Sequence, residues 1–72
     1  MFTFTHSIHF RSGDKSLPYR SVNRWKTAKG ALNAAERLAR DLDQHYEADK
    51  IAMHRLVVID LDNGSEVLSM AA

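Results

Sequence analysis

The sequence predicts an α+β fold with the order β-β-α-β-β, in which one amphipathic helix packs on one face of a small antiparallel sheet. Three observations predict this fold. The first ten residues alternate between apolar and polar, a long stretch after Thr27 repeats apolar residues every three or four positions, and two apolar runs later in the chain flank an Asn-Gly pair. A chain of 72 residues has room for one hydrophobic core, so we expect residues 1–72 to form a single compact domain.

Two extended segments are predicted before the helix. In the first, one side of the strand carries Phe2, Phe4, His6, Ile8 and Phe10. Gly13 and Asp14 then indicate a turn. The second segment is expected from about Leu17 to Arg24, and Pro18, which has no N–H to donate, places it at an edge of the sheet.

The helix has the clearest pattern in the sequence. Thr27 is the expected N-cap. After it, apolar residues recur at spacings of three and four: Ala28, Ala31, Leu32, Ala35, Leu38, Ala39, Leu42 and Tyr46. The pattern predicts a helix that ends near Ala48 and Asp49. Because its buried stripe is rich in Ala, this helix can lie close to the sheet.

A β-hairpin is predicted after the helix. Its first strand is expected over Ile51 to Leu61, and the turn over Asp62-Asn63-Gly64-Ser65. Asn-Gly between two apolar runs favours a type I′ turn, which requires positive φ at both central residues. The two-residue loop would be Asn63 and Gly64, and this choice fixes which residues of the two strands face each other.

In the predicted register, Ile59 faces Leu68 and Val57 faces Met70, so one face of the hairpin is apolar. Three more apolar residues fall on the opposite face: Leu56, Val58 and Val67. Since one helix covers only one side of a sheet, these three residues form a candidate association face. The alternative is that they are scattered surface residues or pack at the rim.

The net charge of +1 conceals an uneven distribution along the chain. Residues 1–40 hold eight basic and two acidic residues, a net +6, and residues 41–72 hold two basic and seven acidic residues, a net −5. On the helix this order opposes the macrodipole, because Lys26 and Lys29 lie at the N-terminus and Asp41 and Asp43 at the C-terminus. Each such charge costs on the order of a few tenths of a kcal/mol.

Basic and aromatic residues are interleaved where the second strand leads into the helix. This basic junction consists of Arg20, Arg24, Trp25, Lys26 and Lys29. Such a pattern is typical of surfaces that contact phosphate backbones, stack on bases or bind acidic proteins. The alternative is a solvated surface on which Trp25 anchors the rim of the core.

Residue patterns for catalysis are missing from the sequence. There is no Cys, no nucleophile elbow and no glycine-rich phosphate loop. His6 and His9 point to opposite faces of a strand, and His45 and His54 could approach each other but lack a third ligand at a recognisable spacing. We therefore expect no enzyme, no metal site and no cofactor.

Targeting signals are also missing. Met1 to Phe10 contain no basic and apolar regions of a secretory signal, and the apolar run Leu56 to Ile59 is far shorter than the ~20 residues of a membrane helix. We therefore expect a cytoplasmic protein without membrane contact.

Residues 25–32, Trp-Lys-Thr-Ala-Lys-Gly-Ala-Leu, and residues 34–39, Ala-Ala-Glu-Arg-Leu-Ala, resemble the strand-to-helix junction of very small phage and mobile-element proteins. With its length and element order, the chain is similar to the compact sheet-plus-helix proteins among the anti-CRISPR inhibitors. The resemblance implies a non-enzymatic protein that binds a host protein complex, such as a CRISPR effector, in the host cytoplasm. It would block a nucleic-acid-binding or effector-recruiting surface of that complex, and no functional residue carries over from the family.

The alternative function is that of a small nucleic-acid-binding protein that uses the basic junction. A homodimer is compatible with either function. It would be joined through the second face of the sheet or through the edge of the N-terminal strand.

Overall fold

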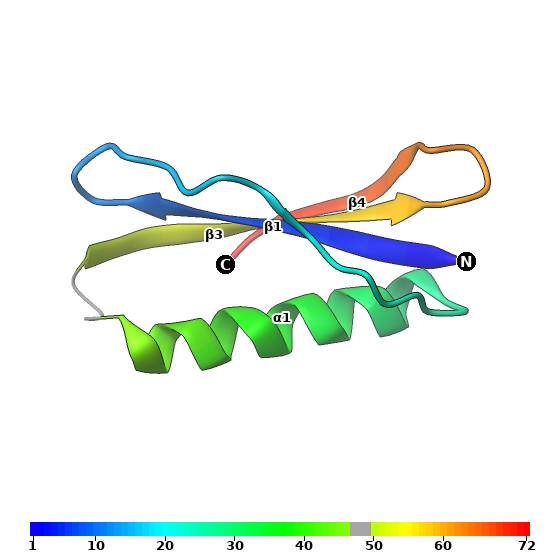
Figure 1. Ribbon diagram of the computed structural model, residues 1–72, viewed down its shortest axis with the longest axis horizontal. Helices are drawn as coiled ribbons and strands as arrows, with labels where there is room; N and C mark the ends of the chain where they lie inside the picture. Colours follow the sequence, from blue (N-terminus) through cyan, green and yellow to red (C-terminus); the bar gives the residue numbers. More distant parts are fainter. Residues whose placement is uncertain (47–49) are drawn as a thin grey trace.

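The computed structural model describes residues 1–46 and 50–72. Its elements are β1 (Phe2–Phe10), β2 (Tyr19–Arg20), α1 (Ala28–His45), β3 (Ile51–Asp60) and β4 (Glu66–Ala71). The strands form one antiparallel sheet in the order β2-β1-β3-β4, and α1 lies along one face of it (Figure 1). The predicted α+β fold and its element order are confirmed. Within the described residues, no helix combines the length and apolar character needed to cross a membrane.

The helix begins as predicted. The Thr27 hydroxyl accepts a hydrogen bond from the Gly30 backbone N–H at 3.0 Å, which satisfies a donor that the helix itself leaves free. The fully buried stripe consists of Ala31, Ala35 and Ala39. The predicted helix end near Ala48 and Asp49 lies outside the described residues, and α1 as described ends at His45.

The core lies between α1 and the two central strands. Phe4 and Ile8 of β1 meet Leu56 and Val58 of β3 on the face that the helix covers. Leu56 and Val58 are 0% exposed. Their burial contradicts the predicted association face, of which only Val67 is exposed, at 41%.

The predicted hairpin register is also wrong. Val58 pairs with Leu68 and Leu56 with Met70, one residue away from the predicted pairing. Successive side chains of a strand point to opposite faces, so a shift of one residue exchanges the faces. The face without the helix carries Val57, which is also buried.

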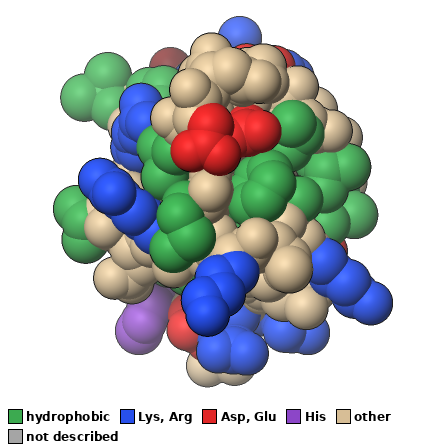
Figure 2. Space-filling view, turned by 90° about the vertical axis from the view of Figure 1, so that its right-hand side faces the viewer, with side chains coloured by type: hydrophobic (Ala, Val, Ile, Leu, Met, Phe, Trp, Pro, Cys, Tyr) green, Lys and Arg blue, Asp and Glu red, His purple; other side chains and the backbone are tan. Residues whose placement is uncertain are grey.

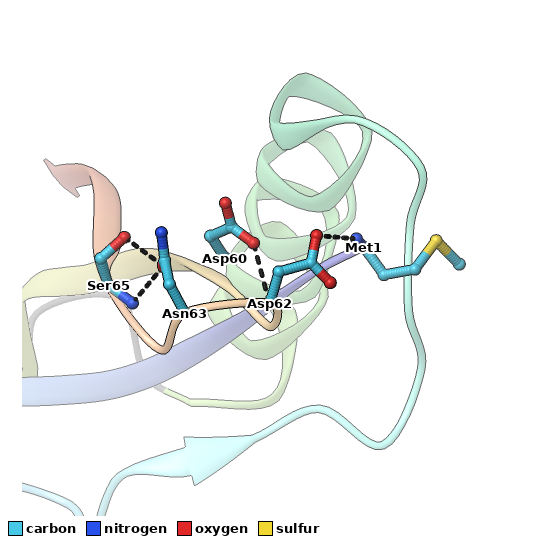
Figure 3. A network of polar contacts seen from close by, with 5 residues as sticks. All are labelled: Met1, Asp60, Asp62, Asn63 and Ser65. Atoms are coloured by element: carbon cyan, nitrogen blue, oxygen red, sulfur yellow. Dashed lines mark hydrogen bonds and ion pairs between the residues drawn. The ribbon is translucent and has the colours of Figure 1, made fainter.

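The turn between β3 and β4 explains the shift. Its loop is four residues long, because the backbone N–H of Asp60 donates to the carbonyl of Ser65 and Gly64 N–H donates back to Asp60. Of the turn residues, Gly64 has a positive φ of 72° and Asn63 does not, which excludes the predicted type I′ turn. Side chains stabilise the loop. The side-chain oxygen Oδ1 of Asn63 accepts hydrogen bonds from the backbone N–H and the hydroxyl of Ser65, and the Asp62 carboxylate forms an ion pair with the amino group of Met1 (Figure 3).

The outer edge of β1 is covered by the segment that follows it. β2 is much shorter than the predicted second strand, but its neighbours continue along β1: Ser16 N–H donates to Ile8, and Ser21 N–H donates to Phe4. Trp25 then exchanges two backbone hydrogen bonds with Phe2. Since β1 lies between β2 and β3, a dimer through the edge of the N-terminal strand is excluded in this fold.

Candidate functional site

The five residues of the basic junction lie on three consecutive pieces of the chain. Arg20 is in β2, Arg24 to Lys26 are in the connection that follows, and Lys29 is in the first turn of α1. The four basic side chains are exposed. Arg20 and Arg24 line one shallow hollow of about 260 Å³, whereas Lys26 and Lys29 do not.

Trp25 is partly buried and packs against the core. Its ring lies 5.5 Å from the ring of Phe4, centroid to centroid, and it packs against the buried cluster around Leu56. A Cβ added at Gly30 would lie 3.5 Å from Trp25, so the ring is also covered by the start of the helix. Trp25 therefore anchors the rim of the core, which is the alternative reading of the sequence.

At one end of the molecule, residues from the basic and the acidic halves of the sequence lie close together. Phe2 pairs with Trp25, and Leu61 N–H donates to the carbonyl of Met1, so the basic junction and the acidic β3–β4 turn flank the same end of β1. Figure 2 faces this end and shows acidic side chains in its upper half, with Lys and Arg side chains at the left and toward the helix below. The mixture of charges weakens attraction to a phosphate backbone.

A buried pair of histidines lies at the other end of the core. His6 Nε2 of β1 is 2.8 Å from His54 Nδ1 of β3, and His54 Nε2 is 2.6 Å from a carboxylate oxygen of Asp43 in α1. Both histidines are buried, whereas the Asp43 side chain is half exposed. The three side chains therefore form a line of hydrogen bonds from the core to the surface.

The Asp43 carboxylate determines which ring nitrogens of His54 and His6 carry a hydrogen atom in this network. Since Asp43 only accepts, His54 Nε2–H is the donor, and a neutral His54 then offers Nδ1 as an acceptor to His6 Nε2–H. Burial, and after it the neighbouring His54, lower the pKa of His6 below the ordinary 6.5, while Asp43 opposes the shift. The lowered pKa favours the neutral form of His6.

Sequence reasoning missed this network, although a signal for it was present. Asp43 follows Ala31, Ala35 and Ala39 at the same spacing of four, so it continues the buried stripe of the helix toward the sheet. Asp43, whose charge opposes the helix macrodipole, has a structural role as the partner of His54. The pairing of His54 with His45, which the sequence suggested, is replaced by pairing with His6.

Beside this network, α1 and β4 enclose a groove. It arises because α1 packs on β1 and β3, so the side chains of the edge strand β4 extend beyond the helix. The groove has a volume of about 290 Å³. We call it the β4 groove, and its lining consists of Glu36, Ala39, Arg40, Asp43, His54, Met70, Ala71 and Ala72.

The outer edge of β4 is open. In the described chain, β4 has β3 on one side and no strand on the other. Ala72 and His54 exchange both backbone hydrogen bonds. In an antiparallel pair such residues alternate with residues whose N–H and C=O point outward, and these are Ser69 and Ala71.

The side chains along this edge are apolar. Val67, Leu68 and Met70 are each about two-fifths exposed, and the stretch from Val67 to Ala71 has no charged residue. A free edge of this kind is a template for pairing with another chain. The edge and the adjoining β4 groove together form the candidate functional site.

His6, His54 and Asp43 lie in a line, and within residues 1–46 and 50–72 no group of three or more metal-binding side chains converges on one point. Comparison with models of protein families, with curated proteins and with solved structures gives no match for this chain.

Proposed function

We propose that this chain is a non-enzymatic binding domain, to which a partner protein adds a strand at the free edge of β4. The observation that supports the proposal is the outward N–H and C=O groups of Ser69 and Ala71, beside exposed Leu68 and Met70. Strand addition uses such main-chain groups for affinity and the neighbouring side-chain sites for specificity. Residues 15–25 cover the outer edge of β1, whereas among the described residues no strand lies along the outer edge of β4.

The partner class follows from the resemblance of the sequence to anti-CRISPR inhibitors. CRISPR effector complexes are therefore the first partners to test. An inhibitor that adds to a strand of such a complex acts by occupying a surface, and it needs no reactive side chain. The β4 groove would receive apolar side chains of the partner next to the added strand.

The test is co-migration of the chain with purified CRISPR effector complexes in size-exclusion chromatography. Ser69→Pro removes an outward N–H without touching the hydrogen bonds between β3 and β4, and we expect it to abolish co-migration. Ser69→Ala keeps the N–H and is the matched control, which should co-migrate like the original chain. No co-migration with any effector complex would contradict the anti-CRISPR function, and equal co-migration of both variants would contradict binding at β4.

A second candidate function is nucleic-acid binding through the basic junction. One observation favours it: Arg20 and Arg24 line the same hollow and are exposed. The test is a gel-shift titration across salt concentrations, in which the double variant Arg24→Glu with Lys26→Glu should lose binding. Absence of binding at low salt, or binding that the double variant retains, would rule this function out.

A further inference from the structure

The sequence of β4 fits a second copy of itself. In an antiparallel pairing centred on Ser69, Leu68 of one copy lies opposite Met70 of the other, and the same pair recurs on the other side of the axis. Leu68 and Met70 share the face on which α1 lies, because they pair with Val58 and Leu56 of the core. The outward groups of Ser69 meet the same groups of the second copy, as a hydrogen-bonded pair requires.

We propose that a second copy of this chain occupies the free edge of β4, related by a two-fold axis through Ser69. This inference rests on the proposed function in that it uses the same free edge of β4, for which a second copy and an effector complex would compete. An axis perpendicular to the sheet joins the two four-stranded sheets into one and keeps both helices on the same face. The apolar side chains of Leu68 and Met70 from both copies then fill the space between the helices.

The charges beside the groove are compatible with this arrangement. Glu36 and Arg40 lie one helical turn apart and line the β4 groove next to Met70. A two-fold axis reverses the direction of α1, so Glu36 of one copy lies on the side of Arg40 of the other. Opposite charges across the axis favour the pairing, and the stretch from Val67 to Ala71 brings no charge of its own.

Charged substitutions at Ser69 test the two-fold axis, because in the proposed pairing Ser69 is the residue of β4 that lies opposite the same residue of the second copy. Sedimentation equilibrium should give a mass that approaches twice that of one chain as concentration rises. We expect Ser69→Lys and Ser69→Glu each to weaken self-association by about tenfold or more at low salt, because like charges then lie opposite each other. An equimolar mixture of the two variants should associate again. Asn33→Lys, on the exposed side of α1, is the control and should associate like the original chain.

The outcomes separate this inference from the proposed function. A chain that stays monomeric at all concentrations, or a dimer that neither charge variant weakens, would overturn the two-fold pairing. A mixture that stays monomeric would overturn the register at Ser69. If the chain is monomeric but Ser69→Pro still abolishes co-migration with an effector complex, strand addition at β4 stands with a different partner.

Discussion

His6 Nε2 lies 2.8 Å from His54 Nδ1, although the two residues are not opposite each other in the sheet. Ile8 is opposite His54, and Leu56 is opposite His6, so the two rings meet along the diagonal. Their centroids are 5.1 Å apart and their planes are inclined by 27°. Because both rings are buried under α1, their charge state and their hydrogen bonds affect the stability of the whole fold.

Asp43→Ala should destabilise the protein. The change removes the acceptor of the His54 Nε2–H, and we expect the free energy of unfolding to fall by about 1–2 kcal/mol. Urea denaturation at neutral pH measures this loss. Asp41→Ala is the control, since it removes an exposed carboxylate from the same end of the helix and should change stability by less than about 0.5 kcal/mol. Equal losses would show that Asp43 acts only through its charge at the helix end.

Stability should fall as the pH drops below about 6.5, the ordinary pKa of histidine. The pKa of His6 is lowered in the folded state, first by burial and then by His54, so the unfolded chain takes up a proton before the folded chain does. The stabilising contribution is complete above pH 6.5 and is lost as the pH falls toward the folded-state pKa. The groups that face His6 are His54 on β3 and Asp43 on α1.

The comparison of two histidine variants isolates this effect. His6→Gln keeps an N–H donor for His54 and should flatten the stability profile below pH 6.5. His9→Gln, on the opposite side of β1, should leave the profile unchanged. Denaturation midpoints measured across the acidic range provide the readout, and a profile that is equally steep in all three proteins would contradict the assignment to His6.

Ala35→Leu should be poorly tolerated. Ala35 is 0% exposed and lies in the buried cluster with Phe4 and Leu56, so a larger side chain pushes α1 away from the sheet. We expect a loss of about 1–3 kcal/mol by chemical denaturation. Asn33→Leu introduces the same side chain on the exposed side of the same helix and should cost little. Similar losses for both variants would mean that the helix does not pack closely through Ala35.

The loss of stability caused by a substitution at Gly64 should depend on how readily the new residue adopts a positive φ. Gly64 has φ of 72° and open space around a Cβ, so strain comes from the backbone and not from a clash. Gly64→Val is expected to cost about 1–2 kcal/mol, whereas Gly64→Asn should cost less, because Asn visits this region more readily. Thermal unfolding of the two variants side by side decides this, and equal stability would contradict the turn geometry.

The helix could be predicted in detail because its signals are local. A Thr cap and an Ala stripe with a spacing of four act within a few turns, and the structure has both at Thr27 and at Ala31, Ala35 and Ala39. The same spacing pointed to Asp43 as an inward-facing residue. What the sequence could not show was that His54 would lie opposite it, because this depends on how β1 aligns with β3.

The hairpin shows the limit of local signals more directly. Asn63-Gly64 correctly marked a turn, but the loop is closed by hydrogen bonds of Asp60 with Ser65 and Gly64, and a bulge at Val67 follows. A difference of one residue placed Leu68 and Met70 on the same face as Leu56 and Val58, and α1 buries Leu56 and Val58 on that face. Because the burial of β3 depends on α1 as well as on the turn, the turn sequence by itself did not determine the register.

The place of β1 in the sheet also constrains how the molecule forms. The hydrogen bond between His6 and His54 joins residues 48 positions apart, and the whole pairing of β1 with β3 spans a similar separation. Closing such a loop costs chain entropy that local contacts do not recover, so sheets with distant pairings form slowly. We therefore expect α1 and the β3–β4 hairpin to gain structure first, with the pairing of β1 with β3 as the slow step. During synthesis, β1 emerges before β3 and remains without this central partner until β3 follows.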